Sequence, residues 1–172
     1  MNISPLAVVH PEAQIGHNVT IDPFAVIEND VVIGDNCRIY SLAVILDGAR
    51  IGKNCNIFPG AVVAGIPQDM KFAGETTTAE IGDNTTLREC VTINRGTASK
   101  GKTVVGCDCL IMAYSHVAHD CVLKDHIIIG NASQIAGEVE IDDFAIVSGG
   151  SLVHQFTRIS KHVMVLGGSR IG

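Results

Sequence analysis

The sequence is poor in aromatic residues and in positive charge. It contains no tryptophan, aromatic side chains make up 4% of its 172 residues, and its net charge is −6. Nucleic-acid binding uses basic side chains to neutralise phosphates and aromatic rings to stack bases, so both shortages argue against a nucleic-acid partner. No run of 18 apolar residues is present, and the N-terminus lacks the basic stretch and apolar stretch of a secretory signal. We therefore expect a cytoplasmic protein without a membrane span.

What the sequence does have is a period of six. Every sixth residue from Ile3 to Ile171 is Ile, Val or Leu at 26 of 29 positions. The exceptions fall in two stretches, 69–80 and 99–104, which we interpret as insertions of twelve and six residues that keep the frame. Neither the 3.6-residue helical period nor the two-residue strand alternation produces this pattern, whereas a β-solenoid of hexapeptides does. We predict one all-β domain over residues 1–172 with two inserted loops.

A second interior position follows four residues after each aliphatic one and carries small side chains. Four of the six cysteines occupy it, namely Cys37, Cys55, Cys109 and Cys121. This placement predicts free thiols packed as small hydrophobes rather than disulfides or a metal cage. Glycine directly follows many of the aliphatic residues, at Gly16, Gly34, Gly52, Gly82, Gly106 and Gly130. We expect these glycines to occupy turns that need a positive φ.

The period alone leaves the handedness of the solenoid open. Runs such as IGDNCR (33–38), IGKNCN (51–56) and IGDNTT (81–86) resemble the hexapeptide-repeat transferases. That resemblance implies a left-handed, triangular parallel β-helix with three hexads per turn. One coil is then 18 residues long, and side chains 18 residues apart stack in a column.

The segment SHVAHDCVLKDH (115–126) holds three of the seven histidines: His116, His119 and His126. Because Val117 and Cys121 take the interior positions, His119 and Asp120 are free to face a groove or a partner chain. Adding one coil to His119 places Gly137 beside it. An imidazole that accepts a proton next to a backbone N–H that stabilises an oxyanion is suited to acyl transfer and needs no cofactor. A solvent-exposed corner histidine is the alternative.

Longer motifs, including VTINRGT, HVAHDC, LVHQF, HVMV and GIPQDMKFAGE, resemble the family of UDP-N-acetylglucosamine 3-O-acyltransferases over essentially the whole chain. These enzymes begin lipid A synthesis. The resemblance implies transfer of a (3R)-hydroxyacyl group from acyl carrier protein to the 3-hydroxyl of UDP-N-acetylglucosamine. The acyl group arrives on the phosphopantetheine arm of the carrier, so neither a bound cofactor nor a metal is expected. The resemblance also implies a homotrimer.

The same resemblance assigns roles to individual residues. It makes His119 the general base, Asp120 its supporting carboxylate and Gly137 the oxyanion donor. The implied substrate contacts are Gln68, Asp69, Lys71, His116, His154 and Gln155, with the first insertion reaching toward a neighbouring subunit's cleft. Gly167 falls near the position that limits acyl-chain length, and a glycine there favours a long chain. His126 and His162 receive no role.

The chain departs from the family in several respects, one of which is Asn94, at a position that is often histidine. Glu138 stands where many members have histidine, one coil from Asp120, so two carboxylates are expected to face each other. Such a pair raises the pKa of one carboxyl group or requires a nearby cation. Family members also continue into a C-terminal helical cap, which is absent from this chain.

Three other functions compete with the acyltransferase reading. An acetyl-CoA-dependent hexapeptide transferase is the runner-up, and the first insertion argues against it. A γ-type carbonic anhydrase would bind zinc through three histidines, but its His-x4-His pair differs from the His-x2-His spacing of His116 and His119. The third alternative is an inactive scaffold.

Overall fold

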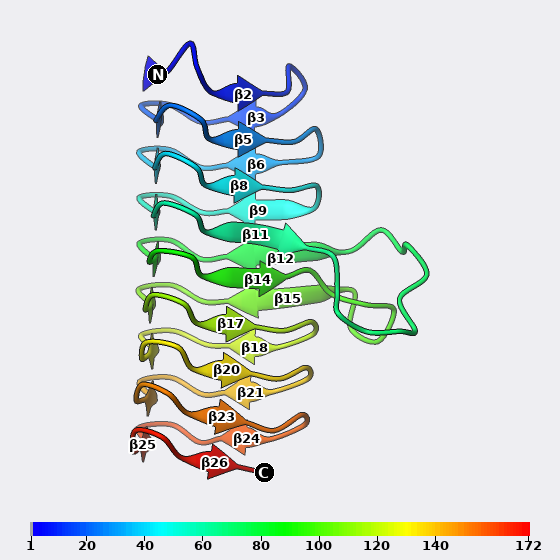
Figure 1. Cartoon of the computed structure of the whole chain (residues 1–172), viewed down its shortest axis with the longest axis vertical. Helices are drawn as coiled ribbons and strands as arrows, with labels where there is room; N and C mark the ends of the chain where they lie inside the picture. The colour runs from blue at the N-terminus through cyan, green and yellow to red at the C-terminus, as the bar shows by residue number, and fades with distance from the viewer. Residues whose placement is uncertain (1) are drawn as a thin grey trace.

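Residues 2–172, which the computed structural model describes, form 26 short strands in three parallel sheets. Successive coils stack along one axis, with the N-terminus at one end and the C-terminus at the other (Figure 1). The predicted left-handed parallel β-helix is confirmed. This part of the chain has no helix that is long and apolar enough to cross a membrane.

Each complete coil contributes one strand to each sheet. The first sheet contains β1 (Asn2–Ile3), β4 (Thr20–Ile21), β7 (Arg38–Ile39), β10 (Asn56–Ile57), β13 (Thr86–Leu87), β16 (Leu110–Ile111), β19 (Ile128–Ile129), β22 (Ile146–Val147) and β25 (Met164–Val165). The second contains β2 (Val8–Val9), β5 (Val26–Ile27), β8 (Val44–Ile45), β11 (Val62–Gly65), β14 (Thr92–Asn94), β17 (His116–Val117), β20 (Gln134–Ile135), β23 (Leu152–Val153) and β26 (Arg170–Ile171). The third contains β3 (Gln14–Ile15), β6 (Val32–Ile33), β9 (Ala49–Ile51), β12 (Thr78–Ile81), β15 (Lys102–Val105), β18 (Val122–Leu123), β21 (Glu140–Ile141) and β24 (Arg158–Ile159).

The six-residue period forms the core. Its aliphatic side chains point inward and stack in register, as Ile39, Ile57, Leu87, Ile111 and Ile129 do in the first sheet, each with no exposed area. Full burial of such a side chain is worth about 1.5–3 kcal/mol, so the column is a main source of stability.

The small-residue position also faces the interior, as predicted for the four cysteines there. Their thiols are free and buried, and those of Cys109 and Cys121 donate to carbonyl oxygens of the next coil. Burial raises the pKa of Cys109 to about 11 and that of Cys121 to about 12. These thiols therefore stay protonated and act as packing groups.

The glycines that follow the aliphatic residues do not adopt a positive φ, so that prediction was wrong. A Cβ on Gly34 would lie 2.6 Å from the carbonyl oxygen of Gly52, and one on Gly82 would lie 2.5 Å from the carbonyl carbon of Gly106. Glycine is needed there because the coils approach closely. The left-handed residues sit two positions later and include Asn18, Asn36, Asn54 and Asn84. Asparagine tolerates this conformation better than most side chains.

Both insertions leave the helix on the same side and protrude from it together (Figure 1). The residues outside the ladder are 66–77 and 95–101, while Thr78–Glu80 and Lys102–Val104, which the sequence frame included in the insertions, extend β12 and β15. Ile81 pairs with both Ile51 and Val105, so the register resumes after each loop. The loops thus add side chains at one corner without disturbing the core.

Candidate active site

The predicted dyad lies on the corner between β17 and β18. Val117 and Cys121 are fully buried on either side and fix the turn, as predicted. Asp120 occupies the left-handed region with φ 60°, which aspartate tolerates. The turn directs the His119 ring into a groove and the Asp120 side chain behind it.

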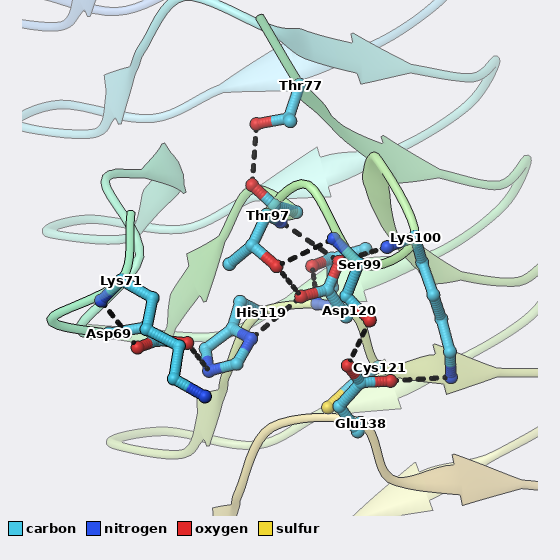
Figure 2. A network of polar contacts seen from close by, with 12 residues as sticks. Asp69, Lys71, Thr77, Thr97, Ser99, Lys100, His119, Asp120, Cys121 and Glu138 are labelled. Atoms are coloured by element: carbon cyan, nitrogen blue, oxygen red, sulfur yellow. Dashed lines mark hydrogen bonds and ion pairs between the residues drawn. The ribbon is translucent and has the colours of Figure 1, made fainter. Parts of the chain in front are cut away.

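The carboxylate of Asp120 is fully buried and fully hydrogen-bonded. Its Oδ2 lies 2.8 Å from His119 Nδ1 and accepts from the Thr97 hydroxyl at 2.6 Å. Its Oδ1 accepts from the backbone N–H groups of Thr97 (2.9 Å) and Lys100 (3.2 Å), as Figure 2 shows. Burial opposes ionisation, but the hydrogen bonds from Thr97, His119 and the two amides outweigh it and lower the pKa of Asp120.

An ionised Asp120 determines which ring nitrogen of His119 is protonated. The carboxylate can only accept, so Nδ1 carries the proton and donates it. In the neutral ring, Nε2 then has a free lone pair that faces the groove. The nearest carboxylate oxygen on that side, Asp69 Oδ2, lies 3.9 Å from Nε2, beyond hydrogen-bond distance.

Asp69 belongs to the first inserted loop, which turns back toward the dyad (Figure 2). The backbone N–H of Lys71 donates to Asp69 Oδ1 at 2.9 Å and holds that carboxylate in place. Gln68 lines the groove. The loop reaches the groove of its own chain because the corner that carries it also carries His119. Its expected reach toward a neighbouring subunit's cleft stays a prediction.

Gly137 stacks against the imidazole, one coil from His119. A Cβ at this position would lie 2.6 Å from Cε1 and 2.7 Å from Nε2 of that ring, so only glycine fits. The carbonyl of His119 accepts from the Glu138 N–H at 3.0 Å and ties the two coils together. Within residues 2–172 the Gly137 N–H has no acceptor. The geometry thus leaves a free amide beside a free imidazole nitrogen.

These groups open into a groove of about 700 Å³. Six of the residues predicted from the sequence line it: Gln68, His116, His119, Gly137, His154 and Gln155. Apolar walls come from Ala118, Ile135, Ala136, Leu152 and Val153, and Arg170, Ile171 and Gly172 also line the groove. A narrow apolar groove with a few polar groups suits a ligand that is part chain and part polar head.

The neighbours of His116 in the groove wall also determine whether its ring is protonated. Its Nδ1 lies 2.7 Å from the Thr92 hydroxyl. Burial lowers the pKa of His116, and the neighbouring His119 acts in the same direction against the opposing effect of Thr92. His116 is therefore a neutral hydrogen-bonding group near pH 7.

Four predicted residues lie outside the groove lining, and two of these, Asp69 and Asp120, lie beside His119. Lys71 is exposed on the first loop. Gly167 is exposed on another corner of the solenoid, where a Cβ would approach Gly149 O at 3.3 Å. The chain alone does not bring Gly167 to the groove.

The second inserted loop supplies a cation, Lys100, beside the two carboxylates of Asp120 and Glu138, as the sequence led us to expect. The Lys100 ammonium lies 3.3 Å from Glu138 Oε2, and the Ser99 hydroxyl donates to Glu138 Oε1 at 2.5 Å. Burial disfavours the charged lysine, but Glu138 and Glu140 outweigh it and raise the pKa of Lys100. Lys100 thus balances the charge of Glu138, whereas buried hydrogen bonds stabilise the charge of Asp120.

Thr97, Ser99 and Lys100 received no role from the sequence, although VTINRGT was among the motifs. Counting back from His119 by one coil plus the six-residue insertion reaches Arg95, at the start of this loop. The column spacing therefore predicts that the loop neighbours the dyad. It does not predict which donors turn inward.

The remaining histidines take no part in the groove. His126 and His162 stack on either side of Phe144, with ring centroids 4.6 and 5.0 Å from it. Over residues 2–172, no group of three His, Cys, Asp or Glu side chains has the geometry of a metal site.

The family model for bacterial transferase hexapeptides (six repeats) matches residues 12–47, 30–65 and 102–137. An acyl-(acyl-carrier-protein)–UDP-N-acetylglucosamine O-acyltransferase of Burkholderia mallei is 50% identical over 112 residues, which is 64% of this chain and 43% of that protein. The chain therefore aligns with less than half the length of such curated relatives.

Solved structures match over more of the chain. The UDP-N-acetylglucosamine acyltransferase LpxA of Bacteroides fragilis superposes with a TM-score of 0.97 at 56% identity, over 98% of this chain and 66% of that one. LpxA of Acinetobacter baumannii gives a TM-score of 0.98 at 39% identity, over 100% of this chain and 67% of that one. On the repeats, the sequence identity and the superposition together, the chain belongs to the hexapeptide-repeat family of UDP-N-acetylglucosamine acyltransferases.

Proposed function

We propose that the chain transfers a (3R)-hydroxyacyl group from acyl carrier protein to the 3-hydroxyl of UDP-N-acetylglucosamine, the first step of lipid A synthesis. The observation that carries the proposal is the His119 ring, with Nδ1 on Asp120, Nε2 open to the groove and the free Gly137 amide beside it. The names of the relatives supply the two substrates. An inactive scaffold would have no reason to maintain a buried, fully bonded dyad.

The reaction follows from these positions. His119 Nε2 takes the proton of the sugar 3-hydroxyl while the oxygen attacks the thioester carbon of the acyl donor. The Gly137 N–H donates to the oxyanion that forms, and Asp120 stabilises the imidazolium. When the intermediate collapses, the C–S bond breaks, the thiolate of the phosphopantetheine arm leaves, and the imidazolium returns its proton to that sulfur. No bound cofactor or metal takes part in this scheme.

The substrate contacts divide between the groove and the loop. Gln68, His116, His154 and Gln155 line the groove and are suited to hydrogen-bond a sugar and an acyl hydroxyl. Asp69 and Lys71 stand where the loop meets the dyad, and we assign them to the polar head of the substrate.

We further propose a cytoplasmic homotrimer. One corner of the solenoid carries an unbroken column of uncharged residues, which we call the apolar corner: Leu6, Phe24, Leu42, Gly60, Cys90, Tyr114, Ala132, Gly150 and Gly168. Its large side chains are about 60% exposed, which favours association of copies. Gly167 lies away from the groove of its own chain. In a trimer it would limit acyl-chain length only by lining the groove of a second subunit.

The experiment is to mix the purified protein with UDP-N-acetylglucosamine and one donor at a time, either (3R)-hydroxyacyl carrier proteins of several chain lengths or acetyl-CoA, and to measure product mass. We expect a UDP-3-O-hydroxyacyl product from a carrier-bound donor, and a rate lower by about a thousandfold in His119→Ala. His17→Ala is the matched control because its ring is exposed and makes no side-chain hydrogen bond.

Product from acetyl-CoA alone would favour the runner-up transferase. A rate unchanged in His119→Ala would remove the general base from the scheme. Zinc in stoichiometric amount in the same sample, with activity that depends on it, would favour the carbonic-anhydrase-like reading.

A further inference from the structure

Thr97, on the second inserted loop, is bonded to Asp120 more closely than any other residue (Figure 2). We propose that Thr97 is the positioning residue of the His119–Asp120 dyad and that loop 95–101 acts as a clamp that sets the orientation of the base. The kinetic part of this inference rests on the proposed acyltransferase function. The geometric part, in which Thr97 orients the Asp120 carboxylate, does not rest on that function.

Thr97 fixes the plane of the carboxylate because it bonds to both of its oxygens. Its hydroxyl donates to Oδ2 at 2.6 Å and its backbone N–H donates to Oδ1 at 2.9 Å. Oδ2 is the same oxygen that His119 Nδ1 uses, so any rotation of the carboxylate moves the ring. Thr97 is 8% exposed and Asp120 is fully buried, which leaves water little opportunity to replace these bonds.

The clamp is itself held at both ends. On one side the Thr77 hydroxyl donates to the Gly96 carbonyl at 2.6 Å. On the other side Ser99 and Lys100 bind the carboxylate of Glu138, one coil beyond Asp120. Thr97 therefore lies between a bond to the end of the first inserted loop and bonds to the coil of Glu138.

The clamp also affects ionisation. Removing the Thr97 hydroxyl takes away the side-chain donor that most favours the charged form of Asp120. The other charged or titratable groups near the dyad are Asp69, Lys71, Lys100, His116, Cys121 and Glu138, and the substitution changes none of them. The pKa of Asp120 should therefore rise in a variant that lacks only this hydroxyl.

The test uses Thr97→Val, which keeps the shape and the backbone N–H, together with Thr97→Ser, which keeps the hydroxyl. Thr85→Val is the matched control. The Thr85 hydroxyl is buried, donates to the Gly106 carbonyl at 2.7 Å and accepts the Cys109 N–H, yet it lies outside the groove lining. It measures what any lost buried threonine hydroxyl costs the fold.

We expect Thr97→Val to lower kcat by about tenfold to a hundredfold with KM changed less than twofold, since a bond to a charged group is lost but no substrate contact is. Thr97→Ser should recover most of the rate, and Thr85→Val should keep kcat. Equal losses of kcat in Thr97→Val and Thr85→Val would mean that Thr97 is an ordinary structural residue, and would overturn the proposal.

A second readout is independent of any substrate. NMR titration of the Asp120 carboxyl and the His119 ring should show the Asp120 transition at higher pH in Thr97→Val and unchanged in Thr85→Val. Coincident Asp120 transitions in wild type and Thr97→Val would overturn the clamp even if no acyl donor is active. If Thr97→Val does not fold, Ser99→Ala weakens the attachment of the loop to Glu138, which Lys100 alone then holds, and leaves both Thr97 bonds to Asp120. A fall in kcat of a few-fold at constant KM then supports the clamp, and an unchanged kcat contradicts it.

Discussion

Two corners of the same solenoid use aspartate in different ways. At the first, which we call the capped corner, an aspartate accepts the backbone N–H of the residue one coil before it. These bonds join Asp35 to His17 (2.8 Å), Asp83 to Lys53 (2.7 Å), Asp125 to Cys107 (2.8 Å) and Asp143 to Asp125 (3.1 Å). At the second, the site corner of His119, Gly137 and Gln155, the residue that would cap Gly137 is Gln155, and no such bond forms within residues 2–172.

The difference shows that few substitutions convert a structural corner of the repeat into a functional site. At the capped corner these carboxylates satisfy the amides of His17, Lys53, Cys107 and Asp125, and they join neighbouring coils. At the site corner the aspartate moves one position along the turn, where it bonds to His119 and to loop 95–101. Within residues 2–172 the amide of Gly137 is left free, because Gln155 stands where the capped corner has an aspartate that accepts such an amide.

Among changes outside the dyad itself, the largest effect should come from Gly137→Ala. Its Cβ would overlap the His119 ring, and a displacement of the base by about 1 Å costs about a hundredfold in rate. Gly34→Ala is the counterpart elsewhere in the helix, because its Cβ meets the Gly52 carbonyl. We expect Gly34→Ala to lower the free energy of unfolding by about 2 kcal/mol with kcat retained. Denaturant unfolding and initial rates on both variants separate the two outcomes, and a kcat retained in Gly137→Ala would contradict the arrangement.

A smaller effect should follow from making the site corner resemble the capped one. Gln155→Asp places a carboxylate where it can accept the Gly137 N–H, as Asp35 accepts that of His17. Loss of an oxyanion donor costs 10²–10³ in rate, and we expect about tenfold because a half-buried carboxylate binds the amide only part of the time. Gln155→Asn controls for the lost glutamine. Equal rates in the two variants would mean that the amide is not an oxyanion donor.

The smallest effect concerns stability against pH. Asp120 has a lowered pKa in the folded chain, so it contributes stability above its ordinary value of about 3.9 and loses it as the pH falls through the lowered value. Asp120→Asn should make the loss of stability below about pH 4 less steep. The pKa of Asp35 is also lowered, chiefly by the His17 amide, but its solvent exposure should make Asp35→Asn a weaker change. Urea unfolding from pH 2 to 7 measures both, and identical curves for wild type and Asp120→Asn would contradict the Asp120 contribution.

Much of the fold could be predicted because one physical requirement repeats. An aliphatic side chain must point inward in every hexad, so the frame located the strands of Ile57 and Ile111 and kept its register through both insertions. The same arithmetic placed Gly137 beside His119. Backbone dihedrals do not follow from spacing, which is why the glycines were assigned the wrong conformation.

The rest of the site depends on how the loops fold back. Nothing in the spacing says that Thr97 turns its hydroxyl inward or that Lys100 neutralises Glu138, because both follow from the path of loop 95–101. The reach of Gln68 and Asp69 to their own groove is of the same kind. Positions on the regular coil could be predicted, whereas contacts made by inserted residues could not.

The most direct test of the two corners is the rate of acyl transfer by Asp120→Asn beside that of Asp125→Asn. Both changes remove one charge with no change of shape, and asparagine at 125 can still accept the Cys107 N–H. We predict a loss of about a thousandfold for Asp120→Asn, because an amide at that position no longer fixes the proton on Nδ1 of His119, and less than a twofold change for Asp125→Asn. Similar rates for the two variants would contradict the distinction between a corner that builds the fold and a corner that carries the chemistry.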